Sequence, residues 1–186
     1  NIHDKYISMA IHGTFKLSTK SDEMSLLSFP GIGRFAAFSG NGNNKNQAGC
    51  ITNINKGPIP LGKYWIVNRP TVNLIMELKG FIKDLTNELL LSPSDRSQWY
   101  ALYRNDSNID DYTWVNNVRR GNFRLHPKGA ANLSLGCITL SSYSEFEILR
   151  IALLRTPPIL ISNTRIQAFG SIEVYADEIK PCPSSR

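Results

Sequence analysis

The sequence is poor in the residues that most often carry metal and covalent chemistry. It has only three cysteines and three histidines among 186 residues. None of them form a short ligand pair such as Cys-x-x-Cys, so no metal site is predicted. The Gly-rich stretch 40–57 lacks a Gly-Lys-Ser/Thr ending, which excludes a nucleotide site of the P-loop type. We therefore expect neither a metal nor another cofactor.

Long apolar runs and a targeting segment are also missing. No run approaches the roughly 20 apolar residues that cross a bilayer. The first residues lack a basic region followed by an apolar run, the pattern of a signal peptide. We expect no stable membrane insertion and secretion without a visible signal peptide, with a trimmed form of a longer protein as the alternative.

Charge is modest and unevenly balanced. The chain has 21 Lys and Arg against 15 Asp and Glu, a formal net charge of +6, and 41% hydrophobic residues. This composition predicts a folded protein, most simply one domain over 1–186. Arg119 and Arg120 form the only basic doublet, and no stripe of cations alternates with aromatics, so nucleic acid is not the expected partner. A basic surface also suits the anionic bacterial cell wall.

The most informative stretch is 123–140, which contains His126 and Cys137 eleven residues apart. Each lies beside a short apolar run, and a loop rich in turn-forming residues separates them. Two strands joined by this loop would bring the imidazole close enough to hold the thiol as a thiolate–imidazolium pair. Gly136 would leave room for a substrate carbonyl beside backbone N–H groups. A buried structural cysteine and a structural histidine are the alternative.

Two blocks of sequence resemble a known family. His126, followed by a loop and Ser134-Leu-Gly136-Cys137, resembles the signature of the L,D-transpeptidase superfamily. It is most similar to the smaller branch found among type VI secretion effectors that attack peptidoglycan. The segments 38–42 and 55–64 resemble that branch's F-S-G and G-P-I-P-x-G-x-Y pattern, in the same order.

The resemblance implies a fold and a reaction. The fold would be mainly β with flanking helices, an L,D-transpeptidase-like β-sandwich. Cys137 would attack the meso-diaminopimelate carbonyl of a stem tetrapeptide and release D-alanine, with His126 transferring the proton. Water would then complete L,D-carboxypeptidase activity, and another amine would give D-amino-acid exchange or cross-linking. The family also implies action in a target cell's periplasm and a cognate immunity protein.

Two positions depart from the family pattern. Many L,D-transpeptidases have His where Leu135 stands and Arg where Thr139 stands. Another cation must then bind a substrate carboxylate, and we expect Arg124, two residues before His126 and hence on the same side of a strand. Ser134 is expected to orient the loop or the substrate, with a plain turn serine as the alternative.

The remaining pattern predicts many short strands and two helices. Alternation or β-branched and aromatic residues predict strands, which include 15–17, 35–38, 63–67, 99–103, 159–161 and 172–175. Apolar spacings of three and four predict an inserted helix over 72–91, and a capping box at Ser142 predicts a second helix to about Leu154. Their order predicts a mainly antiparallel sheet with helices outside it.

Three smaller features leave alternatives open. Cys50 and Cys182 are expected either to pair in an oxidising compartment or to remain unpaired thiols. The Asp-rich loop 105–111 is expected to be solvated, with an acid–base or metal role as the alternative. The tail 181–186 is expected to be loose.

Two other functions remain possible from the sequence. The first is a papain-like cysteine endopeptidase of stem peptides, although such enzymes usually place the cysteine before the histidine. The second is a non-enzymatic wall-binding module, in which replacing Cys137 would change nothing.

Overall fold

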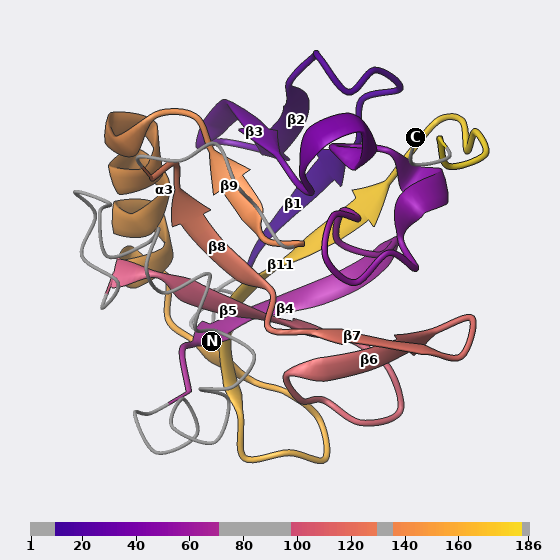
Figure 1. The fold of residues 1–186 in the computed structure, drawn as a ribbon. Helices are drawn as coiled ribbons and strands as arrows, with labels where there is room; N and C mark the ends of the chain where they lie inside the picture. Colours follow the sequence, from indigo (N-terminus) through magenta and orange to yellow (C-terminus); the bar gives the residue numbers. More distant parts are fainter. Residues whose placement is uncertain (1–9, 71–97, 130–135, 184–186) are drawn as a thin grey trace, which may run out of the picture.

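In the part of the chain that the structure describes, eight strands form a closed β-barrel and a helix packs against it (Figure 1). The computed structural model describes residues 10–70, 98–129 and 136–183. The described strands are β1 (Ile11–Lys16), β2 (Ser25–Phe29), β3 (Gly33–Phe38), β4 (Gly62–Asn68), β5 (Tyr100–Arg104), β6 (Tyr112–Val115), β7 (Val118–Gly121), β8 (Arg124–Pro127), β9 (Ile138–Leu140), β10 (Ile159–Leu160) and β11 (Gln167–Tyr175). Two short 3₁₀ helices, Gly42–Asn44 and Ala48–Cys50, follow β3.

Strand pairing gives the sheet order β1-β2-β3-β9-β8-β5-β4-β11-β10, and β1 also pairs with β11. The second pairing closes eight strands into a ring and leaves β10 as an addition at the start of β11. Most neighbours are antiparallel, and the exceptions are β1 with β11 and β8 with β9. The hairpin of β6 and β7 forms a separate two-stranded sheet. The predicted mainly β, L,D-transpeptidase-like fold is confirmed, and its layers form one continuous barrel.

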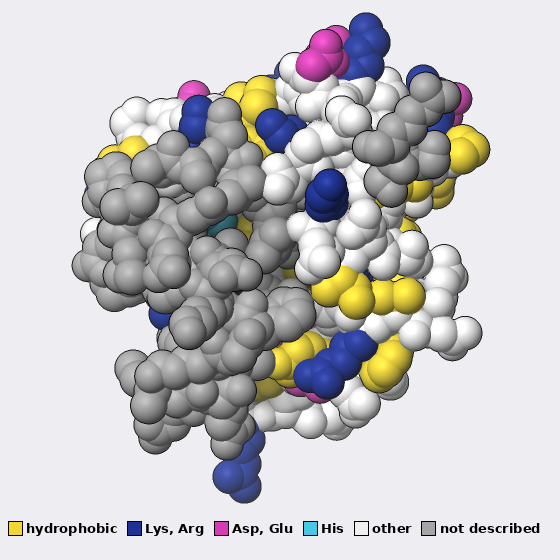
Figure 2. All heavy atoms as spheres, in the orientation of Figure 1, with side chains coloured by type: hydrophobic (Ala, Val, Ile, Leu, Met, Phe, Trp, Pro, Cys, Tyr) yellow, Lys and Arg dark blue, Asp and Glu magenta, His cyan; other side chains and the backbone are white. Residues whose placement is uncertain are grey.

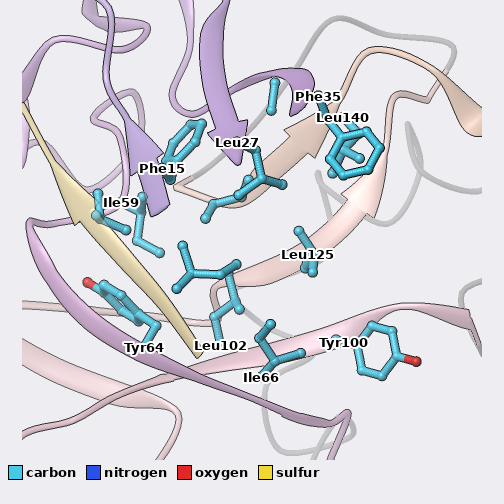
Figure 3. Packing of buried hydrophobic residues seen from close by; sticks show 14 of the residues in the cluster. Phe15, Leu27, Phe35, Ile59, Tyr64, Ile66, Tyr100, Leu102, Leu125 and Leu140 are labelled. Carbon is cyan, nitrogen blue, oxygen red and sulfur yellow. The ribbon is translucent and has the colours of Figure 1, made fainter. Parts of the chain in front are cut away.

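The barrel interior holds the main hydrophobic core. Alternate residues of the strands point inward, as the period of two along a strand requires. Figure 3 shows aromatic and aliphatic side chains from most strands meeting in one cluster, among them Phe15, Leu27, Tyr64, Leu102 and Leu125. Each is at most 1% exposed. The interior is therefore filled by packing, and any reactive groups must lie elsewhere.

One helix, α3 (Tyr143–Arg155), packs against the barrel beside β9. Ser142 caps it by accepting the Glu145 N–H, as the capping box predicts. Phe146, Leu149 and Leu153 are fully buried along its inner side, so this predicted helix is confirmed. The predicted helix over 72–91 lies outside the described residues. In the described ranges, no helix combines the length and apolar character needed to span a bilayer.

The predicted loose tail is wrong at residue 182. Cys182 forms a disulfide with Cys50, 132 residues away, which settles the question left open for this pair. The tail backbone also packs closely on Gly49, where a Cβ atom would overlap the Lys180 carbonyl. A cross-link over so long a loop restricts the unfolded chain and stabilises the fold. Cys137 remains a buried thiol.

Candidate active site

The site forms where β8 and β9 run side by side. The two strands are parallel, with Leu125 opposite Ile138 and His126 opposite Thr139. Leu125 and Ile138 belong to the barrel core, so the alternation along each strand sends His126 and Thr139 to the outer side. Cys137 directly precedes β9 and is two residues from Thr139, which places it on that same side. The fold therefore brings the two sequence-predicted groups onto neighbouring strands.

His126 is held in one tautomer. Its Nδ1 lies 2.8 Å from the carbonyl oxygen of Pro127, which can only accept, so Nδ1 carries the proton. Nε2 is then an acceptor, and the hydroxyl of Thr139 donates to it at 3.3 Å. The Trp99 ring stacks on the imidazole with centroids 4.3 Å apart. The arrangement presents Nε2 as the basic atom.

Burial makes the histidine a neutral group. His126 is 2% exposed, and this desolvation lowers the pKa of the imidazole to about 4, against the opposing effect of the Pro127 carbonyl. The positive charge of Arg124 contributes to the same lowering. At neutral pH the imidazole is therefore uncharged, with Nε2 as a basic nitrogen that accepts a hydrogen bond from Thr139.

The cysteine is neutral for the same reason. Cys137 is 4% exposed, and burial raises the pKa of its thiol to about 11. The charge and the backbone N–H of Arg124 act in the opposite direction. The thiol also donates to the carbonyl of Asn122, with Sγ 3.9 Å from the oxygen. The predicted thiolate–imidazolium pair is thus not the favoured state before substrate binds; both pKa shifts favour a thiol and a neutral imidazole.

Gly136 has to be a glycine at this position. Its φ of +91° lies in the region that side chains rarely adopt. A Cβ atom there would lie 2.6 Å from Nη2 of Arg120 and 2.9 Å from Cε1 of Phe123. The residue before Cys137 is therefore packed directly against a buried guanidinium.

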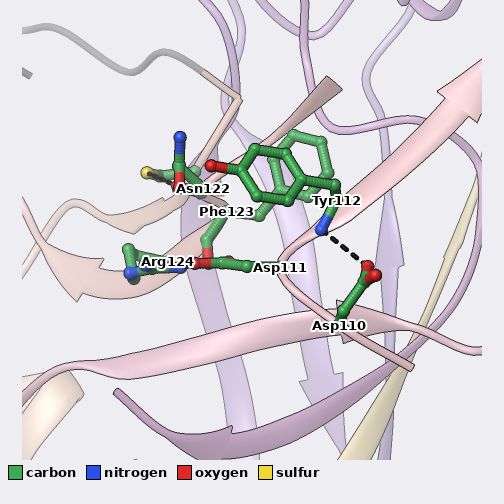
Figure 4. Close-up of polar contacts among 7 residues, drawn as sticks. Asp110, Asp111, Tyr112, Asn122, Phe123 and Arg124 are labelled. Carbon is green, nitrogen blue, oxygen red and sulfur yellow. Dashed lines mark hydrogen bonds and ion pairs between the residues drawn. The ribbon is translucent and has the colours of Figure 1, made fainter. Parts of the chain in front are cut away.

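Arg124 forms a buried ion pair. Its two terminal nitrogens bind the two carboxylate oxygens of Asp111 at 2.7 and 2.8 Å, and Figure 4 shows the guanidinium facing that carboxylate. Burial alone lowers the pKa of Arg124, but the hydrogen bonds and charge of Asp111 outweigh it and raise the pKa. The expectation of a solvated acidic loop is wrong for Asp111, which is 5% exposed, because the arginine compensates its burial. It is confirmed for the exposed Asp106 and Asp110.

The second sequence block, segments 38–42 and 55–64, is held in place by contacts within the block and with the barrel. The Ser39 hydroxyl accepts the N–H of Ile59 at 2.8 Å, and Gly40, at a φ of +90°, lets the backbone of residue 56 approach. The Tyr64 hydroxyl donates to the Pro60 carbonyl at 2.8 Å. These contacts fix the segment 57–62 to the barrel. The small and proline residues of this pattern thus hold the backbone in position.

Sequence reasoning missed four neighbours of the dyad: Asp111, Arg120, Trp99 and Thr139 as a donor to the histidine. The Arg119–Arg120 doublet and the position of Thr139 were visible signals, but neither indicates a contact. Ser134 lies outside the described residues, and its role stays a prediction.

The surroundings give no sign of a metal centre. Across residues 10–70, 98–129 and 136–183, no three His, Cys, Asp or Glu side chains are placed to hold an ion. On the described part of the face in Figure 2, Lys and Arg side chains are scattered rather than gathered in a stripe.

Comparison with known proteins identifies the family. No curated protein matches the chain closely enough to count as a relative. A family model, the Tlde1 domain, matches residues 33–164, which is more than half of the chain and includes His126 and Cys137. The match confirms the resemblance drawn from the sequence blocks. The chain belongs to the Tlde1 domain family, the type VI secretion effectors of the L,D-transpeptidase type, which act on peptidoglycan.

Proposed function

We propose that the chain is a cysteine-dependent enzyme that acts at the meso-diaminopimelate–D-alanine bond of peptidoglycan tetrapeptides. The observation that carries this proposal is that His126 lies on the outer side of β8 while Cys137 directly precedes the parallel neighbour β9, with Nε2 as the basic atom. The family match supplies the polymer and the class of reaction. The side-chain chemistry of His126 and Cys137 supports their proposed roles in that reaction.

The first half-reaction forms a thioester. The Cys137 Sγ attacks the diaminopimelate carbonyl while its proton passes to Nε2 of His126. Because the pKa values favour the neutral pair, proton transfer accompanies C–S bond formation instead of preceding it. The developing oxyanion is stabilised by backbone N–H groups around Gly136 and Cys137. Collapse breaks the C–N bond, and the nitrogen of D-alanine takes the proton back from the imidazolium.

The second half-reaction decides the product. Attack by water on the thioester, with His126 again accepting the proton, gives a tripeptide and restores the thiol. Attack by the amine of a D-amino acid gives exchange, and attack by another stem peptide gives a cross-link. In the producing bacterium a cognate immunity protein would block the site, and the target would be the periplasm of a competitor.

Two assigned roles stay predictions within this scheme. Ser134 is proposed to orient the loop or the substrate. Arg124 is proposed to contact the substrate carboxylate, which requires that its guanidinium bind substrate while Asp111 holds it. Its charge and its backbone N–H both act to lower the pKa of Cys137.

The decisive experiment is mass spectrometry of muropeptides from purified peptidoglycan incubated with the protein. Wild type and the exposed-surface control Glu173→Gln should both remove D-alanine from tetrapeptides, whereas Cys137→Ala should not. Added D-amino acids would reveal exchange. Cleavage elsewhere in the stem would replace the proposal with an endopeptidase. Unchanged muropeptides with all three folded proteins would contradict an enzymatic role and favour a wall-binding module.

A further inference from the structure

Arg120 is a buried cation that forms no ion pair among the described residues. It lies in β7 and is 3% exposed. Its guanidinium donates to three backbone carbonyls, those of Ile51, Gly57 and Pro58, the last two at 3.1 Å. A buried charge is costly unless its donors are satisfied, and here neutral carbonyl dipoles satisfy them.

These carbonyls belong to the segment that the sequence analysis matched as the G-P-I-P block and to the residue after Cys50. Arg120 therefore ties the loop 51–58 to β7 across more than 60 residues of sequence. The loop is also anchored by the disulfide between Cys50 and Cys182. The Arg120 guanidinium and the disulfide thus both hold the loop 51–58 in place.

The other side of the Arg120 guanidinium packs against Gly136. The space that a Cβ atom of Gly136 would occupy is 2.6 Å from Nη2 of Arg120. The Phe123 ring completes the contact, with its centroid 5.6 Å from the Arg120 Cζ. The Arg120 guanidinium therefore lies in close contact with Gly136, the residue that precedes Cys137.

The contrast with Arg124 shows what this position supplies. The charge of Arg124 is balanced by the Asp111 carboxylate, which binds it with both oxygens. The charge of Arg120 faces carbonyl dipoles and the Phe123 ring, with no carboxylate paired to it among the described residues, so its field reaches neighbouring groups in a medium of low dielectric constant. Burial lowers the pKa of Arg120 to about 10, which still leaves it charged at neutral pH, and its charge adds to the larger effect of Arg124 in lowering the pKa of Cys137.

We propose that Arg120 is the positioning residue of the nucleophile, holding segment 57–58 against Gly136 and adding to the positive charge beside Cys137. Its contribution to catalysis rests on the proposed function. Its effect on the thiol does not.

The test uses Cys137 as its own reporter. Since Cys50 and Cys182 form the disulfide, Cys137 is the single thiol, and its alkylation by iodoacetamide follows the thiolate fraction. Arg120→Gln should slow alkylation about tenfold at any pH below the thiol pKa, equivalent to a rise of about one pKa unit. Arg120→Lys keeps the charge and should retain the wild-type alkylation profile. Arg119→Gln, at the exposed neighbouring position, is the matched control and should also retain it.

The rate of D-alanine release then separates the effect of the Arg120 charge from the effect of its carbonyl contacts. Arg120→Lys loses the fork that binds three carbonyls, so D-alanine release should fall in kcat while the alkylation profile stays unchanged. An Arg120→Gln protein that is folded by circular dichroism and alkylates like wild type would overturn the proposal. If Arg120→Gln does not fold, Arg120→Lys decides alone, and a raised thiol pKa in that variant would overturn it. Should wild type leave muropeptides unchanged, the proposed function fails while the alkylation result still stands.

Discussion

The two sides of the β8–β9 pair differ in how they accommodate burial. Leu125 and Ile138 point into the barrel, where apolar contact stabilises them. His126 and Thr139, one residue further along each strand, are also almost fully buried but polar. Their burial is tolerated because each polar atom has a partner, and it shifts the histidine pKa far from its usual value. The same depth therefore stabilises apolar side chains on one side and shifts the pKa of a histidine on the other.

The largest effect should come from breaking the ion pair on the polar side. Asp111→Ala leaves the Arg124 guanidinium buried without its carboxylate, and the free energy of unfolding should fall by about 3–5 kcal/mol. Urea denaturation of the variant beside wild type measures this. The exposed neighbour Asp110→Ala is the control and should lose far less. Equal losses in the two variants would show that the pair has no special weight.

Removing an inner side chain should cost somewhat less. Leu125→Ala opens a cavity in a core where this residue has no exposed surface, with an expected loss of about 3 kcal/mol. Leu26→Ala removes the same atoms from a leucine that is 40% exposed and should cost much less. The measurement is again the midpoint in urea. A loss of the same size at both positions would contradict the assignment of Leu125 to the core.

Acid should lower the free energy of unfolding over a defined pH range, through the burial of His126. The pKa of His126 is lowered to about 4 in the folded state, whereas the unfolded chain binds the proton near pH 6.5. The unfolded state then binds more protons between these values, so stability falls as the pH drops from about 6.5 to 4, by on the order of 2 kcal/mol. Thermal melts across this range should show the slope, and His126→Gln should flatten it. A slope that survives in His126→Gln would assign it to other groups.

The smallest effect should come from the Thr139 hydroxyl. Thr139→Val removes the donor to Nε2 while keeping the shape, and we expect a loss of about 1 kcal/mol. Thr139→Ser retains the hydroxyl and is expected to keep that hydrogen bond. Comparing the two variants by thermal unfolding separates the bond from the methyl packing. If the serine variant loses more than the valine variant, packing outweighs the hydrogen bond at this position.

The sequence predicted the inner side better than the outer one, for a physical reason. Alternating apolar residues and the Ser142 cap are local signals, and they correctly indicated strands and α3. The pairing of Arg124 with Asp111 and the carbonyl contacts of Arg120 depend on how distant segments meet. No local pattern carries that information. The disulfide remained open because three cysteines allow several arrangements, and only the fold brings Cys50 to Cys182.

Closure of the barrel sets the order in which these parts can assemble. The seam joins β1 to β11, which lie at opposite ends of the described chain, and in the ring of strands it is three strands away from both β8 and β9. Pairing across such a long loop is entropically expensive and slows folding. The local hairpins of β1, β2 and β3 are therefore the expected early structures, and the seam a late one. In kinetic terms, β8 and β9 are close in sequence and lie across the ring from the seam, so their pairing does not have to wait for the seam to close.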